Sequence, residues 1–402
     1  MTQASRPLES VSLPASRGRI LVAVLLAGSI GAALVSLSRW SEDPRRWLYS
    51  YLTALVFVIT PSIGALAWLM LQHLTRAVWS VVLRRVLENL TRPLPWLALG
   101  FIPVALHLPR IYSWADPARV ASDPALARKS AWLNPVFFNI RAAAYLAIWA
   151  LLATLLARIS ARQDRLADPR SNDRMRAISS WGLVLLGLTS SYAGFDWLMS
   201  LDPHWASTIY PLILIAGQML AALSFCAAML FLLAQHQPMS DIVQEKHLHS
   251  LGKMMLAFVM LWAYTSYSQL VIIWAGNEPD EISWYLHRLN HGWKYVGLAL
   301  VVFHFAVPFA LLLSRDLKRN ARRLARVAML LVAIRYLDLL FWIAPNALPG
   351  FAHGLRFQWM DIVVPAGIGG IWMAAFVWAL RQRPLIAIHD QRFEEVVGHA
   401  SE

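Results

Sequence analysis

The segment TIYPLILIAGQMLAALSFCAAMLFLLAQ, Thr208–Gln235, decides the fold class of this chain. It contains no charged residue, and it is longer than the roughly 20 apolar residues that cross a bilayer as a helix. The whole chain has the same character, because 58% of its residues are hydrophobic, only 15% are charged and the mean hydropathy is +0.50. The sequence therefore predicts an all-α, polytopic membrane protein.

Similar apolar runs lie on both sides of this segment. Counting them predicts ten membrane spans, over Ile20–Ser38, Trp47–Leu74, Pro93–Leu108, Val136–Arg158, Ala177–Leu201, Thr208–Gln235, Ser250–Ala275, Trp293–Ser314, Leu324–Pro345 and Met360–Leu380. The polar ends, residues 1–19 and 381–402, are predicted to be tails. The first tail lacks an early apolar run followed by a cleavage motif, so we interpret it as retained rather than as a signal peptide.

The lysines and arginines predict the orientation of the spans. Most of them lie in the two tails and in every second loop, and the cytoplasmic side of a membrane protein carries this excess. Both termini are therefore predicted to be cytoplasmic. The net charge of +13 is explained by this topology. A nucleic-acid site is not expected, because the charges do not form one patch.

A weak internal repeat is also present. Leu133-Asn134 precedes the fourth span and Leu289-Asn290 precedes the eighth. Asp196-Trp197 closes the fifth span, while an aspartate and a tryptophan recur near the end of the ninth. The pattern suggests a first four-helix repeat over 47–201 and a second over 208–345, inside a membrane domain of residues 20–380. Four helices per unit would give both copies the same orientation.

The chain offers few ligands for a redox cofactor. Its single cysteine, Cys226, lies inside an apolar run and cannot alone attach a haem or hold an iron–sulfur cluster. His304 lies near the middle of the eighth span, whereas His73 and His107 lie near opposite ends of theirs. Because two axial ligands must lie at a similar depth, we expect neither bound haem nor a metal site.

Ionisable residues inside spans are costly and so suggest function. Arg335 and Asp338, at i and i+3, share one helix face and are predicted either to form a structural ion pair or to belong to a proton or quinone pathway. His304 is either a proton relay or a hydrogen-bonded core histidine. In the seventh span, Lys253, Tyr264 and Ser268 form a polar stripe that would conduct protons or simply join helices.

A second candidate group lies near the predicted outer surface. Between the fifth and sixth spans, the stretch FDWLMSLDPHW, Phe195–Trp205, contains two acids, a histidine and two tryptophans. Asp202 before Pro203 is predicted to cap a helix, whereas Asp196 has no such role and is a candidate proton carrier. We predict an outer-face polar cluster or partner interface formed by Arg141, Asp202, His204, Trp205 and Asp361, which would converge with Asp196 if their helices are neighbours.

The loop between the second and third spans also has a pattern. Within residues 76–92, Trp79, Val82, Val86 and Leu90 recur at helical spacing, with Arg84, Arg85 and Glu88 between them. This pattern predicts a short amphipathic helix on the cytoplasmic membrane surface, and the alternative is a plain solvated connector.

Three segments together resemble one family. FDWLMSLDPHWAST (Phe195–Thr208), LGKMMLAFVMLWAYTSYSQLVIIWA (Leu251–Ala275) and LNPVFFNIR (Leu133–Arg141), with the basic loop around Arg84-Arg85, are similar to the NrfD/PsrC-like membrane subunits of bacterial alternative complex III. Within that family the chain is most similar to the F subunit. The resemblance covers nearly the whole chain from the second span to the tenth.

The resemblance implies two four-helix bundles with two peripheral helices. It also implies a place in the bacterial inner membrane as a subunit of a quinol:cytochrome c (electron-acceptor) oxidoreductase, contributing a quinone-type cavity, a proton pathway or both. The implied ligand is a quinone, menaquinol or ubiquinol. The implied partners are a sister NrfD/PsrC-like subunit, and iron–sulfur and multihaem cytochrome c subunits on the periplasmic side.

Two other functions remain open at this stage. A stand-alone proton-coupled transporter would also carry repeats and charges inside the membrane. Transporters of that kind often have helices broken at corresponding positions of both halves. Here Pro61 and Gly64 interrupt the second span, while the sixth has only Pro211 and Gly217. The correspondence is poor. The other alternative is a structural scaffold in which every buried polar group is paired.

Overall fold

The computed structural model describes residues 15–38, 40–75, 77–168, 170–237, 239–290, 292–346, 354–355, 357–387 and 389–390. Within these residues every regular element is a helix, and eight helices are long and apolar enough to cross a membrane. The prediction of an all-α, polytopic membrane protein is therefore confirmed. These helices are α1 (Ala15–Leu37), α2 (Pro44–Thr75), α9 (Pro135–Leu166), α11 (Tyr210–Leu233), α13 (Glu245–Gly276), α15 with η6 and α16 (Trp293–Leu313), α18 (Ala321–Ile343) and α19 (Met360–Leu380).

Two predicted spans are not among the eight. The third is divided into α4 (Leu94–Leu99), α5 (Ile102–Leu106) and α6 (Leu108–Ile111). Each of these short helices has a proline at its first or second position or just before it, and proline begins helices but interrupts their interiors. The fifth corresponds to α10 (Ser171–Ala193), which is less apolar because it is rich in serine, and which continues through a π turn, η4 (Gly194–Leu198), and η5 (Met199–Leu201).

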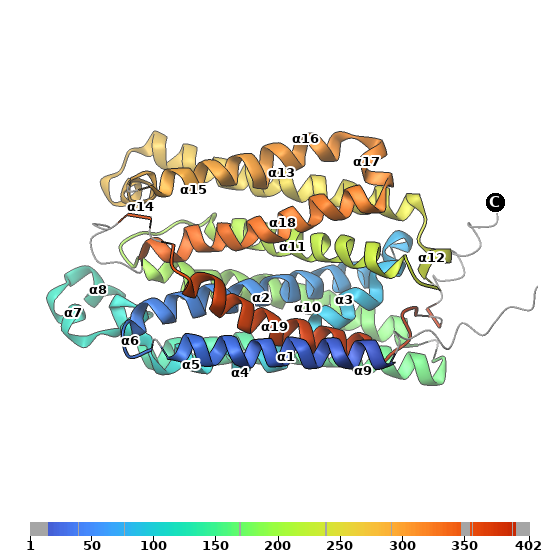
Figure 1. The fold of residues 1–402 in the computed structure, drawn as a ribbon. Helices are drawn as coiled ribbons and strands as arrows, with labels where there is room; N and C mark the ends of the chain where they lie inside the picture. The colour runs from blue at the N-terminus through green and yellow to red at the C-terminus, as the bar shows by residue number, and fades with distance from the viewer. Residues whose placement is uncertain are drawn as a thin grey trace, which may run out of the picture.

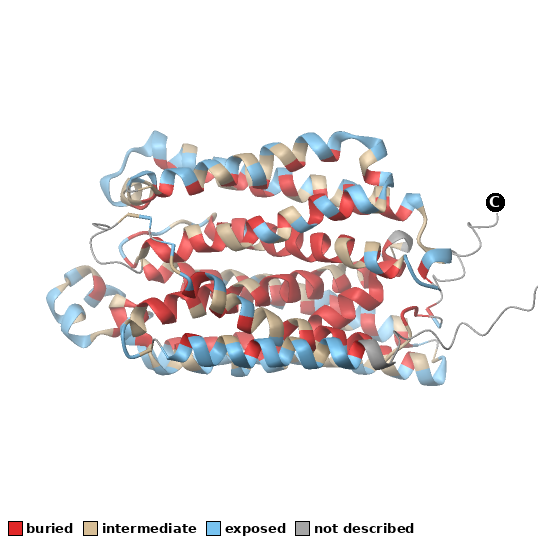
Figure 2. Ribbon diagram, in the orientation of Figure 1, coloured by how far each residue is buried: buried red, intermediate tan, exposed pale blue. Residues whose placement is uncertain are grey.

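The long helices run side by side and pack into two groups (Figure 1). In the first group α2 contacts α4 and α10, and α9 contacts the same two helices. In the second group α11 contacts α13 and α18, and α16 contacts the same two helices. The central helices α2 and α11 join the groups, and most of the buried residues gather around them (Figure 2). Gly64 permits this close approach, because a Cβ atom there would overlap the backbone of Gln218 on α11.

The first and last helices form one edge of the bundle. α19 packs on α2, and α1 packs on α19 (Figure 1). Small residues make this crossing possible, since Gly367 and Gly370 of α19 lie against Ala32 and Ser29 of α1. Most other side chains of α1 are exposed and apolar, as expected for a helix that faces lipid (Figure 2).

Short helices cover the two ends of the bundle (Figure 1). We call them the α14 end, with η3 (Ser113–Ala115), α7 (Pro117–Ser122), α8 (Pro124–Lys129) and α14 (Pro279–Leu289), and the α17 end, with η2 (Val78–Leu83), α3 (Arg84–Thr91), α12 (Met239–Ile242) and α17 (Arg315–Arg319). The charge pattern predicts that the α17 end is cytoplasmic. The tails before residue 15 and after residue 390 lie outside the described residues.

The prediction of a surface amphipathic helix over 76–92 is wrong. All eight residues of α3 are buried, and the helix packs against α2, α9 and α19. Enclosing it is possible because Arg84, Arg85 and Glu88 bond to one another and to neighbouring segments rather than to water. The side chain of Trp79, which belonged to the predicted apolar face, lies outside the described part.

Candidate functional site

A buried ion pair lies in the second group of helices. Arg335 and Asp338 form it one turn apart on α18, and the carboxylate also accepts a hydrogen bond from the Trp342 indole over 3.0 Å. The guanidinium lies against Gly217 on α11, where any Cβ atom would overlap it. The missing side chain at Gly217 therefore leaves room on α11 for the Arg335 guanidinium of α18. The predicted pairing of Arg335 with Asp338 is present.

His304 lies beside this ion pair. It belongs to a π turn, η6 (Val301–Ala306), it is only 1% exposed, and its ring centroid is 3.9 Å from that of Trp262 on α13. Arg335 lies within electrostatic range of the imidazole. π turns often occur where a helix presents a functional side chain. The structure thus brings together His304, Arg335 and Asp338, three of the predicted proton-path residues.

The hydrogen bonds around this cluster are incomplete. Among the described residues, Nδ1 of His304, Nε of Arg335 and the Tyr210 hydroxyl are buried without a hydrogen-bond partner. Tyr210 belongs to the same cluster, because its ring lies 4.1 Å from that of Trp342. Buried polar atoms left without protein partners are usually satisfied by internal water.

The predicted stripe on α13 does not join this cluster. Lys253 and Tyr264 are exposed, Tyr264 by 69%, and Ser268 is only partly buried. The side of α13 that faces the bundle instead carries Trp262, Thr265 and Gln269. The three polar residues do share a region of the helix surface, but that surface points away from the interior.

Asp196 is held by a complete set of donors at the α14 end. It lies in η4 and accepts two hydrogen bonds from Arg141, each 2.8 Å long, one of 2.9 Å from Tyr145 and one of 3.1 Å from the Trp132 indole. The Arg141 guanidinium also packs over the rings of Trp132 and Phe137. Hydrogen bonds between a guanidinium and a carboxylate are among the stronger ones in proteins, and this set favours a structural role for Asp196 in joining α9 to the end of α10.

The other residues of the predicted outer-face cluster are dispersed. His204 bonds to Asp123 of the α7–α8 turn over 2.9 Å, and Trp205 stacks on Trp284 of α14. Asp361 lies at the start of α19, where Arg46 and Ser50 of α2 bind it. Among these five residues the one hydrogen bond that the described structure shows is local, from the Trp205 amide to the Asp202 carbonyl, and Arg141 binds Asp196 instead.

The predicted helix cap at Asp202 is wrong. α11 begins eight residues later, at Tyr210, and Asp202 instead forms a turn in which its carbonyl accepts a hydrogen bond from the Trp205 amide over 3.1 Å. The Asp-Pro pair suggested a helix start, but residues 202–209 form the connection between η5 and α11, and the helix begins only after it.

Arg288 on α14 is a buried cation that the sequence analysis missed. It donates hydrogen bonds to the carbonyls of Trp284, Phe341 and Trp342 over 2.9–3.1 Å and stacks on the Trp284 ring. A cation here satisfies the free carbonyls at the C-terminal end of α18. Burial lowers the pKa of Arg288 to about 10. The spacing of Trp284 and Arg288, one helical turn apart, was the only sequence signal.

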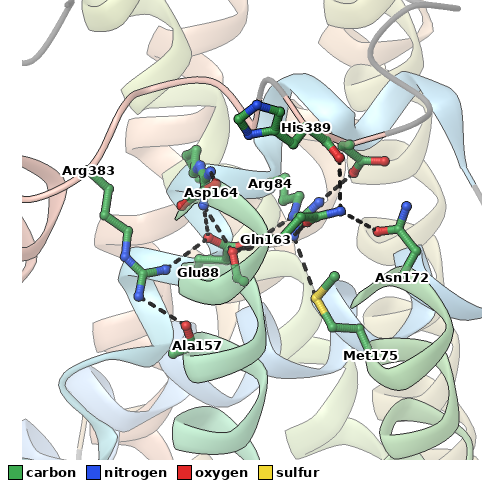
Figure 3. Close-up of polar contacts among 12 residues, drawn as sticks. Arg84, Glu88, Ala157, Gln163, Asp164, Asn172, Met175, Arg383 and His389 are labelled. Atoms are coloured by element: carbon green, nitrogen blue, oxygen red, sulfur yellow. Dashed lines mark hydrogen bonds and ion pairs between the residues drawn. The ribbon is translucent and has the colours of Figure 1, made fainter. Parts of the chain in front are cut away.

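A larger polar network lies at the α17 end (Figure 3). Arg84 is at its centre and donates hydrogen bonds to Glu88, to Gln163 of α9 and to Asp390 after α19. Arg85 bonds to Glu88 over 2.7 Å and to Asp164. Because these partners come from three distant parts of the sequence, the network fastens α3, α9 and the segment after α19 to one another.

Glu88 provides a test of this network. Burial alone would raise its pKa, but the charges of Arg85 and Arg84 outweigh burial and hold the pKa well below its usual range. A lowered pKa stabilises the fold above the unfolded-state pKa of about 4.3, and this stabilisation is lost as the pH falls further. In thermal unfolding in detergent, the midpoint temperature of the wild type is therefore expected to lie above that of Glu88→Gln, and the difference is expected to stay constant between pH 5 and 8. A difference that shrinks already between pH 7 and 5 would contradict this assignment.

A lateral groove lies near Asp196, between the two groups of helices. Its volume is about 480 Å³, and it is lined mainly by apolar side chains of the 192–209 segment and of α13. Gln269 lies at its inner edge, where it accepts a hydrogen bond from Ser207 over 3.0 Å and donates one to Tyr285 over 3.2 Å. Its outer rim is formed by exposed residues, namely Trp132, Tyr192, Thr208 and Ile272.

Comparison of the sequence with known protein-family models gave no match, and no curated protein is significantly similar to it. In the described part of the chain, no three His, Cys, Asp or Glu side chains gather as they would around a metal ion. Cys226 is buried and carries no disulfide. The lateral groove and the His304–Arg335–Asp338 cluster are thus the two features on which a functional interpretation rests.

Proposed function

We propose that this protein is an integral membrane subunit of a bacterial quinol:electron-acceptor oxidoreductase of the alternative complex III type. In this proposal the lateral groove binds the quinone, and the His304–Arg335–Asp338 cluster belongs to a proton pathway. The redox centres would be carried by iron–sulfur and multihaem cytochrome c partner subunits. The assignment to this family rests on the sequence motifs. The proposed roles in quinone binding and proton transfer rest on the lateral groove and on the His304–Arg335–Asp338 cluster.

The lateral groove is the single observation that carries the proposal. A quinol reaches its site from the lipid phase, so its site must open sideways, accept an apolar chain and offer a few polar groups to the ring. The groove has an aromatic and aliphatic lining, with Ser207 and Gln269 as polar groups at its inner edge. Part of its wall is the FDWLMSLDPHWAST segment, on which the resemblance to the family depends.

The interior cluster supports the second half of the proposal. Charged residues at this depth are costly, and they are commonly retained where protons or substrates move. His304 and Arg335 each have one buried nitrogen without a partner among the described residues, and each of these nitrogens remains available to bind water. A histidine is well suited to pass a proton because either ring nitrogen can carry it.

Purification tests the assignment to a complex. The tagged protein, extracted in mild detergent, is expected to bring down c-type haem and iron–sulfur subunits, visible in the absorption spectrum and in the subunit composition. A colourless, monodisperse single polypeptide would overturn the proposal and favour the transporter. If the redox partners co-purify but substitutions in the groove and in the cluster leave the activity of the complex unchanged, the protein would instead be a scaffold.

A substitution that fills the groove tests the quinone site. Ile272→Trp adds bulk to the exposed rim of the groove and would hinder entry of the quinol, so quinol oxidation by the purified complex is expected to fall about tenfold, which corresponds to about 1.4 kcal/mol. Leu270→Trp is the matched control, since Leu270 is on the same helix and exposed but does not line the groove. Equal activities of the two variants would exclude this groove as the quinol site.

A further inference from the structure

A pocket of about 370 Å³ at the α17 end has an unusual lining. It lies between the start of α4, the last turns of α9 and the segment after α19, and we call it the arginine pocket. Four of its described lining residues are arginines and none is acidic. The lining consists of Thr91, Arg92, Pro95, Ala153, Thr154, Ala157, Arg158, Ala161, Arg165 and Arg383.

The positive charge of this pocket is poorly compensated by the protein itself. In the described part of the chain, Arg92, Arg158 and Arg165 form no ion pair, and Arg92 bonds only to the neutral Gln382. Arg383 lies 3.9 Å from Glu88, but the Glu88 carboxylate also forms ion pairs with Arg84 and Arg85, so its one negative charge is shared among three arginines. Burial and the nearby charge of Arg92 lower the pKa of Arg383 to about 10. The site therefore favours an added anion.

The surroundings of the pocket indicate what kind of anion fits. On the membrane side, α4 exposes Trp96 and Leu99, and α9 exposes Leu151 one turn before Thr154. These helices carry apolar surface next to a cationic pocket at the end of the bundle. A ligand that satisfies both surfaces has an anionic head and hydrocarbon chains. Basic pockets between membrane helices bind phospholipid headgroups in this way, and guanidinium groups bind phosphate oxygens with paired hydrogen bonds.

We infer that the arginine pocket binds the phosphate group of an anionic phospholipid, with its acyl chains lying along α4 and α9. Arg158 and Arg165 are on one face of α9, two turns apart, and with Arg92 and Arg383 they place charges on three sides of the phosphate. Arg162 lies on the same helix but outside the pocket, and it pairs with Asp168. The lipid would act as a fastening between α4, α9 and the segment after α19.

Native mass spectrometry of the full-length protein in detergent tests this inference. Phosphatidylglycerol is titrated against the wild type and against the double variant Arg158→Gln/Arg165→Gln, whose substituted side chains are exposed and form no ion pair in the described part of the chain. Because the double variant loses two of the four cationic groups that line the pocket, it is expected to bind phosphatidylglycerol at least tenfold more weakly. Thermal unfolding without added lipid checks that the variant is folded.

Two controls decide the outcome. Arg162→Gln removes one positive charge from the same helix outside the pocket, and it is expected to bind phosphatidylglycerol like the wild type. Phosphatidylcholine is expected to bind weakly to all variants. Equal binding by the wild type and the double variant, or an equal loss in Arg162→Gln, would overturn the inference. Displacement of the lipid by millimolar inorganic phosphate would show that the pocket recognises free phosphate instead, and would also overturn it.

Discussion

Asp338→Ala is expected to lower the free energy of unfolding by about 3–5 kcal/mol, because it leaves the Arg335 guanidinium buried without its counter-charge. Arg335 is 2% exposed, and its remaining hydrogen bond, to the Leu214 carbonyl, is long at 3.4 Å. No other carboxylate among the described residues pairs with it. The loss would be measured by denaturant unfolding in detergent, with tryptophan fluorescence as the signal.

A double variant separates stability from function at this pair. Arg335→Met/Asp338→Leu replaces both charges by apolar groups of similar size, which in buried pairs is often neutral or stabilising. We expect it to recover most of the stability lost in Asp338→Ala. If the pair belongs to a proton pathway, the double variant will still fold but proton translocation by the complex will fall. A stable double variant with normal translocation would leave the pair a purely structural role.

Arg84→Met is the second substitution with a large expected effect. Arg84 is completely buried, and its removal takes one cationic partner from each of the buried carboxylates of Glu88 and Asp390, so a loss of about 3–5 kcal/mol is expected. The segment after α19 should also loosen, because Arg84 binds it through Asp390 (Figure 3). Limited proteolysis followed by mass spectrometry would detect early cleavage in 381–390.

Arg174→Gln is the matched control for this experiment. Arg174 lies at the same end of the bundle and pairs with Asp168, but its side chain is 46% exposed. Exposed pairs contribute at most about 1 kcal/mol, so this variant should unfold and be cleaved like the wild type. Similar losses in both variants would mean that charge at this end matters in general, rather than the contacts of Arg84.

Hydrophobic length predicted most of the fold, whereas the inward faces of the helices could not be predicted. The spans around α2, α9 and α11 follow directly from apolar runs of sufficient length. Periodicity placed Lys253 and Tyr264 on one side of α13, but it did not reveal that this side faces outward. In a membrane, lipid is as apolar as the helix interior, so an apolar face does not identify the core.

Polar contacts were predictable when they are local and not when they are distant. Arg335 and Asp338 are three residues apart, and helix geometry alone suggested their pairing. The contact of Arg141 with Asp196 was one possibility among several in a group that is mostly dispersed. The bond of Arg84 to Asp390 joins residues 306 positions apart. No sequence periodicity carries such information, and this is why α3 was predicted to lie on the surface.

The edge formed by α1 and α19 has a consequence for biogenesis. Among the described helices α1 is synthesised before all the others, yet its principal neighbour, α19, is synthesised after all the others. At 5–20 residues per second the two are separated by an interval on the order of tens of seconds. During that time α1 must persist as an independently inserted span, with the surface around Ser29 and Ala32 open to lipid. The bundle is therefore completed from its centre outward, and a chain that terminates before residue 360 would leave α1 inserted but undocked.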